Sequence, residues 1–160
     1  MTAPLPATQV EHVDLGALGH LLSFFIRSLS IAVSQDLDDQ LKGLEVAQGT
    51  GKISTLLLVN DHPGIRPSVL ARMLFKDRAA MGRIVETMAS QGLLTRQTSA
   101  HDHRAQELYI TDRGRELAAT VTTIVTRQSR AFFHVLDDAE HAQAMRLLQK
   151  VYRRITGIAL

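Results

Sequence analysis

The side chains best suited to binding chemistry are two arginines, Arg78 and Arg83, in the segment 77–91. Apolar residues recur in this segment at the spacing of one helical face: Met81, Ile84, Val85 and Met88. If that face is buried, the residues that point outward are Arg78, Ala79, Gly82, Arg83 and Glu86. Small residues let a backbone approach base edges, and guanidinium groups match guanine O6 and N7 or a phosphate. The segment is predicted to be a helix that enters the major groove of DNA; a solvated charged face is the alternative.

A second group of candidate residues lies in the polar segment 98–105. The segments 94–97 and 106–110 on either side are predicted to be short strands, so that the polar segment joins them as a hairpin. Its tip carries Asp102, His103 and Arg104. An arginine on a protruding ribbon can enter a narrow minor groove, and the charge of His103 would change near its ordinary pKa of about 6.5. We expect His103 and Arg104 to contact DNA, together with Lys76 and Ser68 from the preceding elements.

These residues must be positioned by a chain that is predicted to be mostly helical. The expected helices cover residues 14–41, 52–60, 68–74, 77–91 and 112–135, with a last helix that starts after Asp137. The expected N-caps are Thr50, Asp77, Thr111 and Asp137, the last in a capping box with Glu140, and Gly92 is expected to end the helix 77–91. Arg66 stands where a capping residue is usual, directly before Pro67. The fold class is mostly α with a minor β component, a winged helix-turn-helix with flanking N- and C-terminal helices.

Charge and composition restrict the possible functions. Residues 1–50 hold two Lys/Arg against six Asp/Glu, whereas residues 66–115 hold nine against five, within a net charge of +2. A local basic region suits an anionic partner. The chain of 160 residues has no cysteine, which excludes disulfides and thiol chemistry. No apolar run approaches the ~20 residues of a membrane helix, and no secretory signal is seen, so we expect a cytoplasmic protein without membrane contact.

The hairpin and its neighbours resemble a known family. Residues 92–105 read GLLTRQTSAHDHRA and residues 108–114 read LYITDRG. This looks like the wing signature of the MarR/SlyA family of transcriptional regulators, and the resemblance covers residues 63–114. It implies a homodimer that binds a pseudo-palindromic operator on double-stranded DNA, with Arg83 and Arg104 as the key contacts and Asp102 shaping the wing. In contrast to many family members, this chain has Ala79, Ala80 and Gly82 where Ser or Thr is frequent.

The resemblance also implies a division of the chain and a ligand. Residues 1–13 are expected to be a mobile tail and 49–111 the DNA-binding domain, with 14–48 and 112–160 forming one dimerisation unit. A pocket between these parts would take a small-molecule effector, an aromatic acid or its CoA thioester, through His20, Phe24 and Arg27; an ion pair is the alternative role for Arg27. The predicted function is a ligand-responsive repressor. The alternative is a non-DNA small-molecule-binding or anti-regulator dimer with the same fold.

The sequence lacks the residue spacings that common catalytic and phosphate-binding motifs require. The segment 49–52 reads Gly-Thr-Gly-Lys, but a phosphate-binding loop needs a glycine at position 46 and Ser or Thr at position 53, where Val and Ile stand. His101 and His103 flank an acid and form at most part of a metal site. No Gly-x-Ser-x-Gly nucleophile motif is present. We expect no catalysis, no cofactor and no bound metal.

Overall fold

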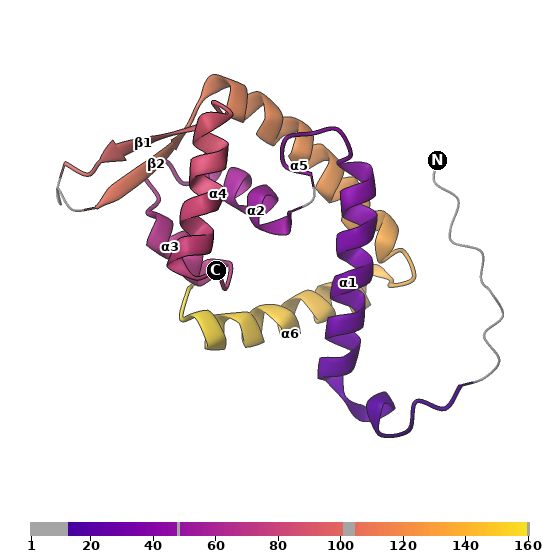
Figure 1. The fold of residues 1–160 in the computed structure, drawn as a ribbon. Coiled ribbons are helices and arrows are strands. Elements are labelled where there is room, and N and C mark those ends of the chain that lie inside the picture. The colour runs from indigo at the N-terminus through magenta and orange to yellow at the C-terminus, as the bar shows by residue number, and fades with distance from the viewer. Residues whose placement is uncertain (1–12, 48, 101–104, 160) are drawn as a thin grey trace. The chain divides into compact units, whose positions relative to one another are not determined.

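The computed structural model describes residues 13–47, 49–100 and 105–159 (Figure 1). The predicted tail at 1–13 lies, apart from Val13, outside the described residues. The described residues form two compact units, which divide between Gln35 and Asp36. The described part of the chain contains no helix that is long and apolar enough to span a membrane.

The first unit holds a short 3-10 helix, Gly16–His20, and most of α1, Leu22–Gln40. The prediction of one continuous helix over 14–41 was therefore wrong at its N-terminal end. Leu21 has an extended backbone, and Gly16 adopts a φ of 52°, with its N–H donating to the Asp14 side chain at 2.8 Å. Gly16 and Gly19 both disfavour an α-helix energetically, so the apolar periodicity that suggested helix begins to be realised as α-helix only at Leu22.

The second unit is a winged helix-turn-helix followed by two long helices. Its order is α2 (Thr50–Asp61), α3 (Pro67–Met73), α4 (Arg78–Ser90), β1 (Leu94–Thr98), β2 (Gln106–Ile110), α5 (Asp112–Phe132) and α6 (Asp138–Thr156). The mostly helical fold class with a two-stranded wing is confirmed. Each helix predicted in this unit is found, with ends that differ from the prediction by at most three residues.

Local sequence explains most helix ends. Asp77 accepts the Ala80 N–H at 2.6 Å, Thr111 accepts the Gly114 N–H at 3.0 Å, and Asp137 forms the predicted capping box with Glu140. Pro67 opens α3, as expected for a residue with a fixed φ and no N–H. The predicted N-cap at Thr50 was wrong, because α2 already begins at Thr50 and Gly49 takes the cap position.

The wing is an antiparallel hairpin in which Leu94 pairs with Ile110 and Thr98 with Gln106. The segment before α3 adds an isolated antiparallel β-bridge to β2. The Leu108 N–H donates to the Ile65 carbonyl at 3.1 Å, and the Gly64 N–H donates to the Leu108 carbonyl at 2.8 Å. Gly64 has a φ of 85°, which favours glycine. The wing is thus fixed to the loop between α2 and α3.

The core lies where α2, α4, α5 and the wing meet. Its fully buried side chains come from every element of the winged helix-turn-helix and from the segment after α1: Leu41, Val46, Leu56, Val59, Leu70, Met81, Met88, Leu93, Leu94, Leu108 and Val121. The predicted inner face of the helix 77–91 is confirmed, with Ile84 only half-buried.

Gly114 brings α5 close to the wing. A Cβ placed at this glycine would lie 2.0 Å from the Leu93 carbonyl oxygen and 2.8 Å from a methyl group of Ile110. No side chain fits there. The Thr-x-x-Gly pattern that follows β2 therefore has a packing cause, namely that the first turn of α5 lies directly on the strand start.

Candidate nucleic-acid interface

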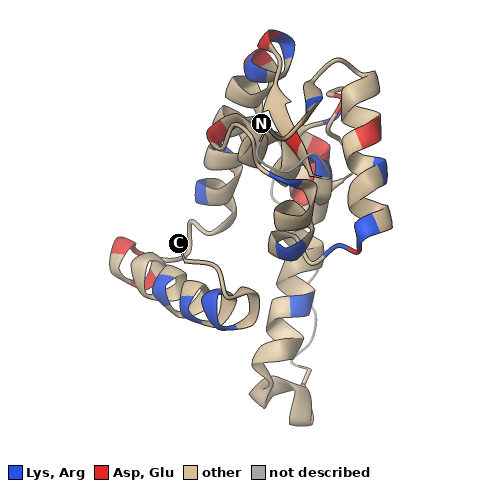
Figure 2. Cartoon of the chain, turned by 90° about the vertical axis from the view of Figure 1, so that its left-hand side faces the viewer, with Lys and Arg blue, Asp and Glu red and all other residues tan. Residues whose placement is uncertain are grey.

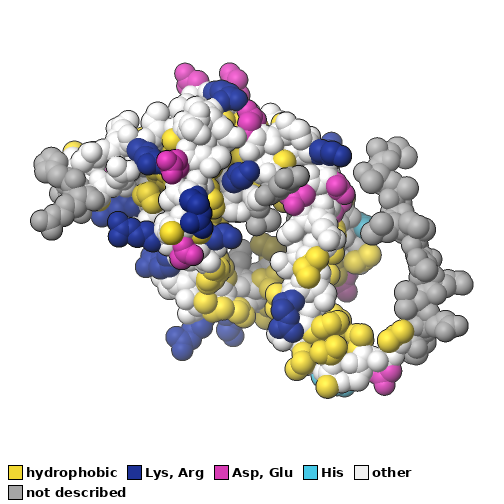
Figure 3. Space-filling model, in the orientation of Figure 1, with side chains coloured by type: hydrophobic (Ala, Val, Ile, Leu, Met, Phe, Trp, Pro, Cys, Tyr) yellow, Lys and Arg dark blue, Asp and Glu magenta, His cyan; other side chains and the backbone are white. Residues whose placement is uncertain are grey.

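The helix α4 presents two chemically different faces. Met81, Val85 and Met88 are buried, whereas Arg78, Ala79, Gly82 and Arg83 are exposed. A space-filling view shows Lys and Arg side chains gathered over α3, α4 and the turn between them (Figure 3). The structure thus places the four α4 residues that the sequence singled out together on one accessible surface.

The turn between α3 and α4 sets the start of this helix. The Asp77 carboxylate caps it at the Ala80 N–H, and Lys76 and Arg78 on either side of Asp77 are exposed. The Lys76 side chain passes beside Gly51 of α2. Ser68 is exposed in the first turn of α3.

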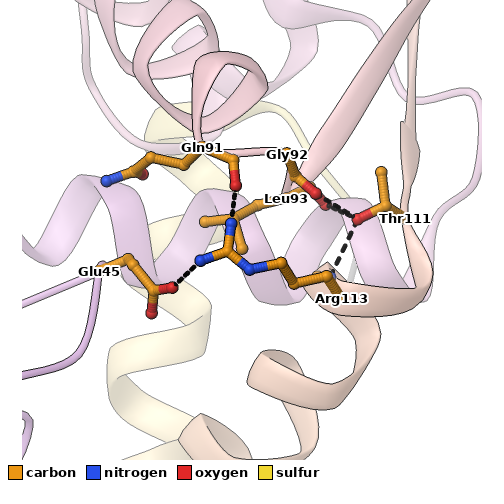
Figure 4. Close-up of polar contacts among 7 residues, drawn as sticks. Glu45, Gln91, Gly92, Leu93, Thr111 and Arg113 are labelled. Atoms are coloured by element: carbon orange, nitrogen blue, oxygen red, sulfur yellow. Dashed lines mark hydrogen bonds and ion pairs between the residues drawn. The ribbon is translucent and has the colours of Figure 1, made fainter.

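The C-terminal end of α4 is fastened by three different groups. Gly92, with a φ of 70°, ends the helix as predicted, and the Leu93 N–H returns to the Met88 carbonyl at 3.0 Å. The Thr111 hydroxyl lies 2.7 Å from the Gly92 carbonyl oxygen. Arg113 of α5 donates to the Gln91 carbonyl and pairs with Glu45 (Figure 4).

Arg113 is a residue whose role the sequence analysis missed. Arg113 is one of the nine Lys and Arg residues that make the segment 66–115 basic. Its guanidinium, however, binds a carboxylate and a backbone carbonyl of the same chain. Its partner Glu45 is 68 positions away, so no local pattern announces the pair. The cationic surface near the wing therefore owes less to Arg113 than the sequence suggested.

Two exposed arginines extend the candidate surface beyond the predicted set. Arg72 lies in the last turn of α3 and Arg96 on β1, and both are exposed. Figure 2 shows several Lys and Arg positions over the winged helix-turn-helix and a further row along α6. Exposure together with position in the helix-turn-helix is the signal that identifies Arg72 and Arg96.

The wing tip itself is not described. Asp102, His103 and Arg104, and the His101 of the possible metal pair, lie outside the described residues. Within the described residues, no group of three His, Cys, Asp or Glu could hold a metal ion. On the strand behind the tip, the Tyr109 hydroxyl donates to Glu107 at 2.8 Å, and this hydrogen bond to a carboxylate raises the pKa of Tyr109.

The candidate effector residues belong to the first unit. His20 ends the 3-10 helix and is exposed, as is Arg27 on α1. Phe24 is half-buried and lies edge-on to Phe25, with ring centroids 5.3 Å apart. The three side chains thus come from two short consecutive segments, and Arg27 is not buried within the chain.

Comparisons with known proteins agree with this architecture. The model of the MarR family matches residues 43–105. A protein of Thauera aromatica that carries the name of a transcriptional regulatory protein for the hcr operon is 28% identical over 141 residues, which cover 87% of this chain and 83% of that protein.

Solved structures share the fold at lower identity. The transcriptional repressor CouR bound to a 23-mer DNA duplex matches with a TM-score of 0.79 and 24% identity, covering 89% of this chain and 100% of that chain. CouR from Rhodococcus jostii RHA1 bound to p-coumaroyl-CoA matches with a TM-score of 0.76 and 20% identity, covering 86% and 95%. Residues 43–105 thus match the MarR family, the named relative is a transcriptional regulatory protein, and the chain shares the winged helix-turn-helix fold of the solved structures.

Proposed function

We propose that the protein is a homodimeric, ligand-responsive repressor that binds a pseudo-palindromic operator. The observation that carries the DNA-binding part is the exposed face of α4, where two arginines flank two small residues on the side of the helix opposite the buried Met81, Val85 and Met88. Residues 49–111 form the DNA-binding domain in this proposal, and residues 14–48 together with 112–160 form the dimerisation unit.

The helix α4 enters the major groove with its exposed face toward the bases. Arg83 reads a guanine edge with its two-pronged guanidinium, and Arg78 binds a base or a phosphate. Ala79 and Gly82 let the helix backbone approach the base pairs. Lys76 and Ser68 bind phosphates on either side of the groove, which fixes the register of the helix.

The wing supplies the second group of contacts. Arg104 enters the adjacent minor groove, Asp102 holds Arg104 in position, and His103 adds a charge that depends on pH. The described strands support this assignment, because the hairpin is anchored to the core through Leu94 and Leu108 at its base. A rigid base is needed if a ribbon is to present its tip to DNA.

A second copy of the chain covers the apolar surface of the long helices. On α6, Leu148, Val151 and Ile155 are each more than half exposed, and their spacing of three and four residues places them on one stripe. Exposed apolar residues on α1 include Leu22, Ile26 and Ile31. Apolar patches of this extent mark protein interfaces, and a symmetric dimer provides one recognition helix for each operator half-site.

The effector is an aromatic acid or its CoA thioester, bound near His20, Phe24 and Arg27. Support for the thioester comes from CouR, which shares this fold and is solved with p-coumaroyl-CoA. Ligand binding must favour one spacing of the two recognition helices over another, because a ligand with equal affinity for both would release no DNA. Adding p-coumaroyl-CoA or the free acid to the protein–operator complex tests this: release by either supports the class, and retention with both contradicts it.

The DNA-binding proposal is tested by selecting duplexes from a random-sequence library with the wild-type protein. The enriched duplex is then bound by wild type, by Arg83→Ala and by Arg127→Ala, a matched loss of an exposed arginine on α5. Arg83→Ala should weaken binding by ~1–3 kcal/mol and relax the preference at one base pair, whereas Arg127→Ala should not. Equal losses of Arg83→Ala on selected and random DNA would contradict base reading.

A second arm concerns the wing. Arg104→Ala should reduce the slope of log affinity against log salt by roughly one, because one phosphate-region contact is lost. An unchanged slope would contradict a wing contact. If the wild-type protein enriches no sequence at all, the alternative function, a small-molecule-binding or anti-regulator dimer without DNA binding, replaces the repressor.

A further inference from the structure

The turn that precedes the recognition helix contains an unusual residue. Phe75 has a φ of 52°, the one positive value of a non-glycine residue in the described part of the chain. It occupies the position after the C-cap of α3, and the Lys76 N–H returns to the Ala71 carbonyl at 2.9 Å. Glycine is the usual residue at this position, because an aromatic residue is strained there. Burial does not explain Phe75, since 63% of the residue is exposed.

Among the residues that the structure describes, the ring of Phe75 has one aromatic partner, Tyr152 of α6. The two rings meet edge to face, with centroids 6.1 Å apart and planes at 88°, a favourable geometry for aromatic pairs. The Tyr152 hydroxyl donates to the Met73 carbonyl at 2.9 Å. That carbonyl belongs to the last residue of α3, where no partner within the helix is available. A single side chain of α6 therefore holds both the end of α3 and the residue that follows it.

The consequence for α4 comes from the short distance along the chain. Asp77, the N-cap of α4, is two residues after Phe75, and Arg78 follows directly. At its other end α4 is held by Arg113 of α5, which donates to the Gln91 carbonyl. The recognition helix is thus attached at both ends to the two C-terminal helices, at its start through Tyr152 and at its finish through Arg113.

We propose that Tyr152, acting through Phe75 and the Met73 carbonyl, is a positioning residue for DNA binding that fixes where the recognition helix begins. This inference rests on the proposed DNA-binding function. Tyr152 borders the stripe of Leu148, Val151 and Ile155 on α6, because it lies four residues after Leu148 and three before Ile155. The contact therefore links the surface proposed to pair two subunits to the helix proposed to read DNA. A change at that surface shifts Arg78 and Ala79 through the turn.

The decisive variant is Phe75→Gly, because it separates positioning from stability. Glycine relieves the strained φ, so the free energy of unfolding should stay the same or rise. Loss of the ring frees the turn, so affinity for the selected duplex should fall about fivefold or more, the lower range of measured site-to-site coupling. Affinity for random DNA should stay at the wild-type value, because every phosphate-binding cation remains. If the contact served stability alone, Phe75→Gly would lower the free energy of unfolding and leave the affinity for the selected duplex unchanged.

Tyr152→Phe tests the hydroxyl separately, since the ring pair with Phe75 is kept. Loss of one neutral hydrogen bond should weaken binding to the selected duplex by roughly two- to tenfold, with binding to random DNA unchanged. Val135→Gly is the matched control for Phe75→Gly, because Val135 is an exposed apolar residue in the turn between α5 and α6, outside the helix-turn-helix. It should bind as wild type.

The outcomes separate this inference from the proposed function. If wild type selects a sequence and Arg83→Ala loses it, but Phe75→Gly and Tyr152→Phe bind it as wild type, the positioning role is overturned and the DNA-binding proposal stands. If Phe75→Gly loses affinity only in proportion to a loss of stability, the positioning role is also overturned. If wild type selects no sequence, the DNA-binding proposal itself fails.

Discussion

Gly82 lies in the middle of the exposed face of α4, and no neighbour in the described part of the chain requires it to lack a side chain. A Cβ placed there would meet no heavy atom within 4 Å. Glycine in a helix interior costs about 1 kcal/mol relative to alanine. Gly114 excludes a side chain by contact with the chain's own backbone, whereas the space at Gly82 is open to solvent. We infer that the open space serves a bound partner, in keeping with a helix that lies close to base pairs.

The first prediction follows from that contrast. Gly82→Ala should raise the free energy of unfolding by about 0.5–1 kcal/mol, because alanine is the better helix former and meets no obstacle. The same variant should bind the selected duplex more weakly, because the added methyl group keeps the backbone away from the bases. Urea unfolding and a gel-shift titration measure the two effects. Tighter or equal DNA binding would show that α4 does not approach the groove at Gly82.

The Tyr109–Glu107 pair gives a prediction about pH. The hydrogen bond to the carboxylate raises the pKa of Tyr109 above its ordinary value, so folding favours the protonated hydroxyl. The resulting stability is fully present below the ordinary tyrosine pKa of about 10 and is lost as pH rises through the folded-state pKa. Because the chain has two tyrosines and no tryptophan, tyrosinate absorbance of Tyr152→Phe reports on Tyr109 alone.

The control for this titration is Glu107→Gln, introduced into the same background. An amide oxygen still accepts a hydrogen bond but carries no charge, so the pKa of Tyr109 should fall back toward its ordinary value. Identical titration curves with and without the carboxylate would mean that the pair does not form in solution.

At the scale of elements, the start of α5 depends on Gly114. Its missing side chain allows the first helical turn to rest on the Leu93 carbonyl, while Thr111 caps the same turn. Gly114→Ala should lower the free energy of unfolding by about 1–3 kcal/mol or more, because backbone atoms cannot move aside as a flexible side chain does. Gly82→Ala serves as the control for the same chemical change in an open position. A wild-type urea midpoint for Gly114→Ala would contradict the close packing.

Local signals predicted the elements well where the cause was local. Asp77, Thr111 and Asp137 each satisfy N–H groups within three residues, so their caps can be read from sequence order. The break at Leu21 was missed because apolar periodicity outweighed the two glycines in the interpretation. The N-cap of α2 was also placed one residue too late. Thr50 was chosen because its hydroxyl could cap a helix, but Gly49 takes the cap position, and glycine is also a common N-cap.

In the candidate site, too, the features with a local cause could be predicted from the sequence and the long-range contacts could not. The two faces of α4 follow from helical spacing alone, and the buried Met81, Val85 and Met88 confirm them. The Arg113–Glu45 pair and the contact of Tyr152 with the Phe75 turn join residues that are far apart along the chain. Such contacts depend on tertiary packing, which no single window of sequence contains. Contacts of the wing tip with DNA stay predictions.

For the whole molecule, the proposed dimer rests on the exposed apolar stripe of α6. Val151→Asp should shift the protein toward a single subunit, because a carboxylate would be buried without a partner in the interface. Sedimentation velocity over a range of protein concentrations measures the shift. Lys150→Asp, on the neighbouring exposed face of the same helix, is the matched control and should leave the assembly unchanged. A Val151→Asp protein that sediments as wild type would place the interface elsewhere.

The position of Tyr152 on α6 affects how the regulator would respond to its own abundance. One helix bears both the stripe that would join two subunits and the hydroxyl that holds the turn before α4. Raising the copy number of the protein in a cell would then do more than fill additional operators. Each newly formed dimer would also hold its recognition helices in the position that binds DNA. The dose–response curve of the controlled gene should accordingly be steeper than simple saturation allows.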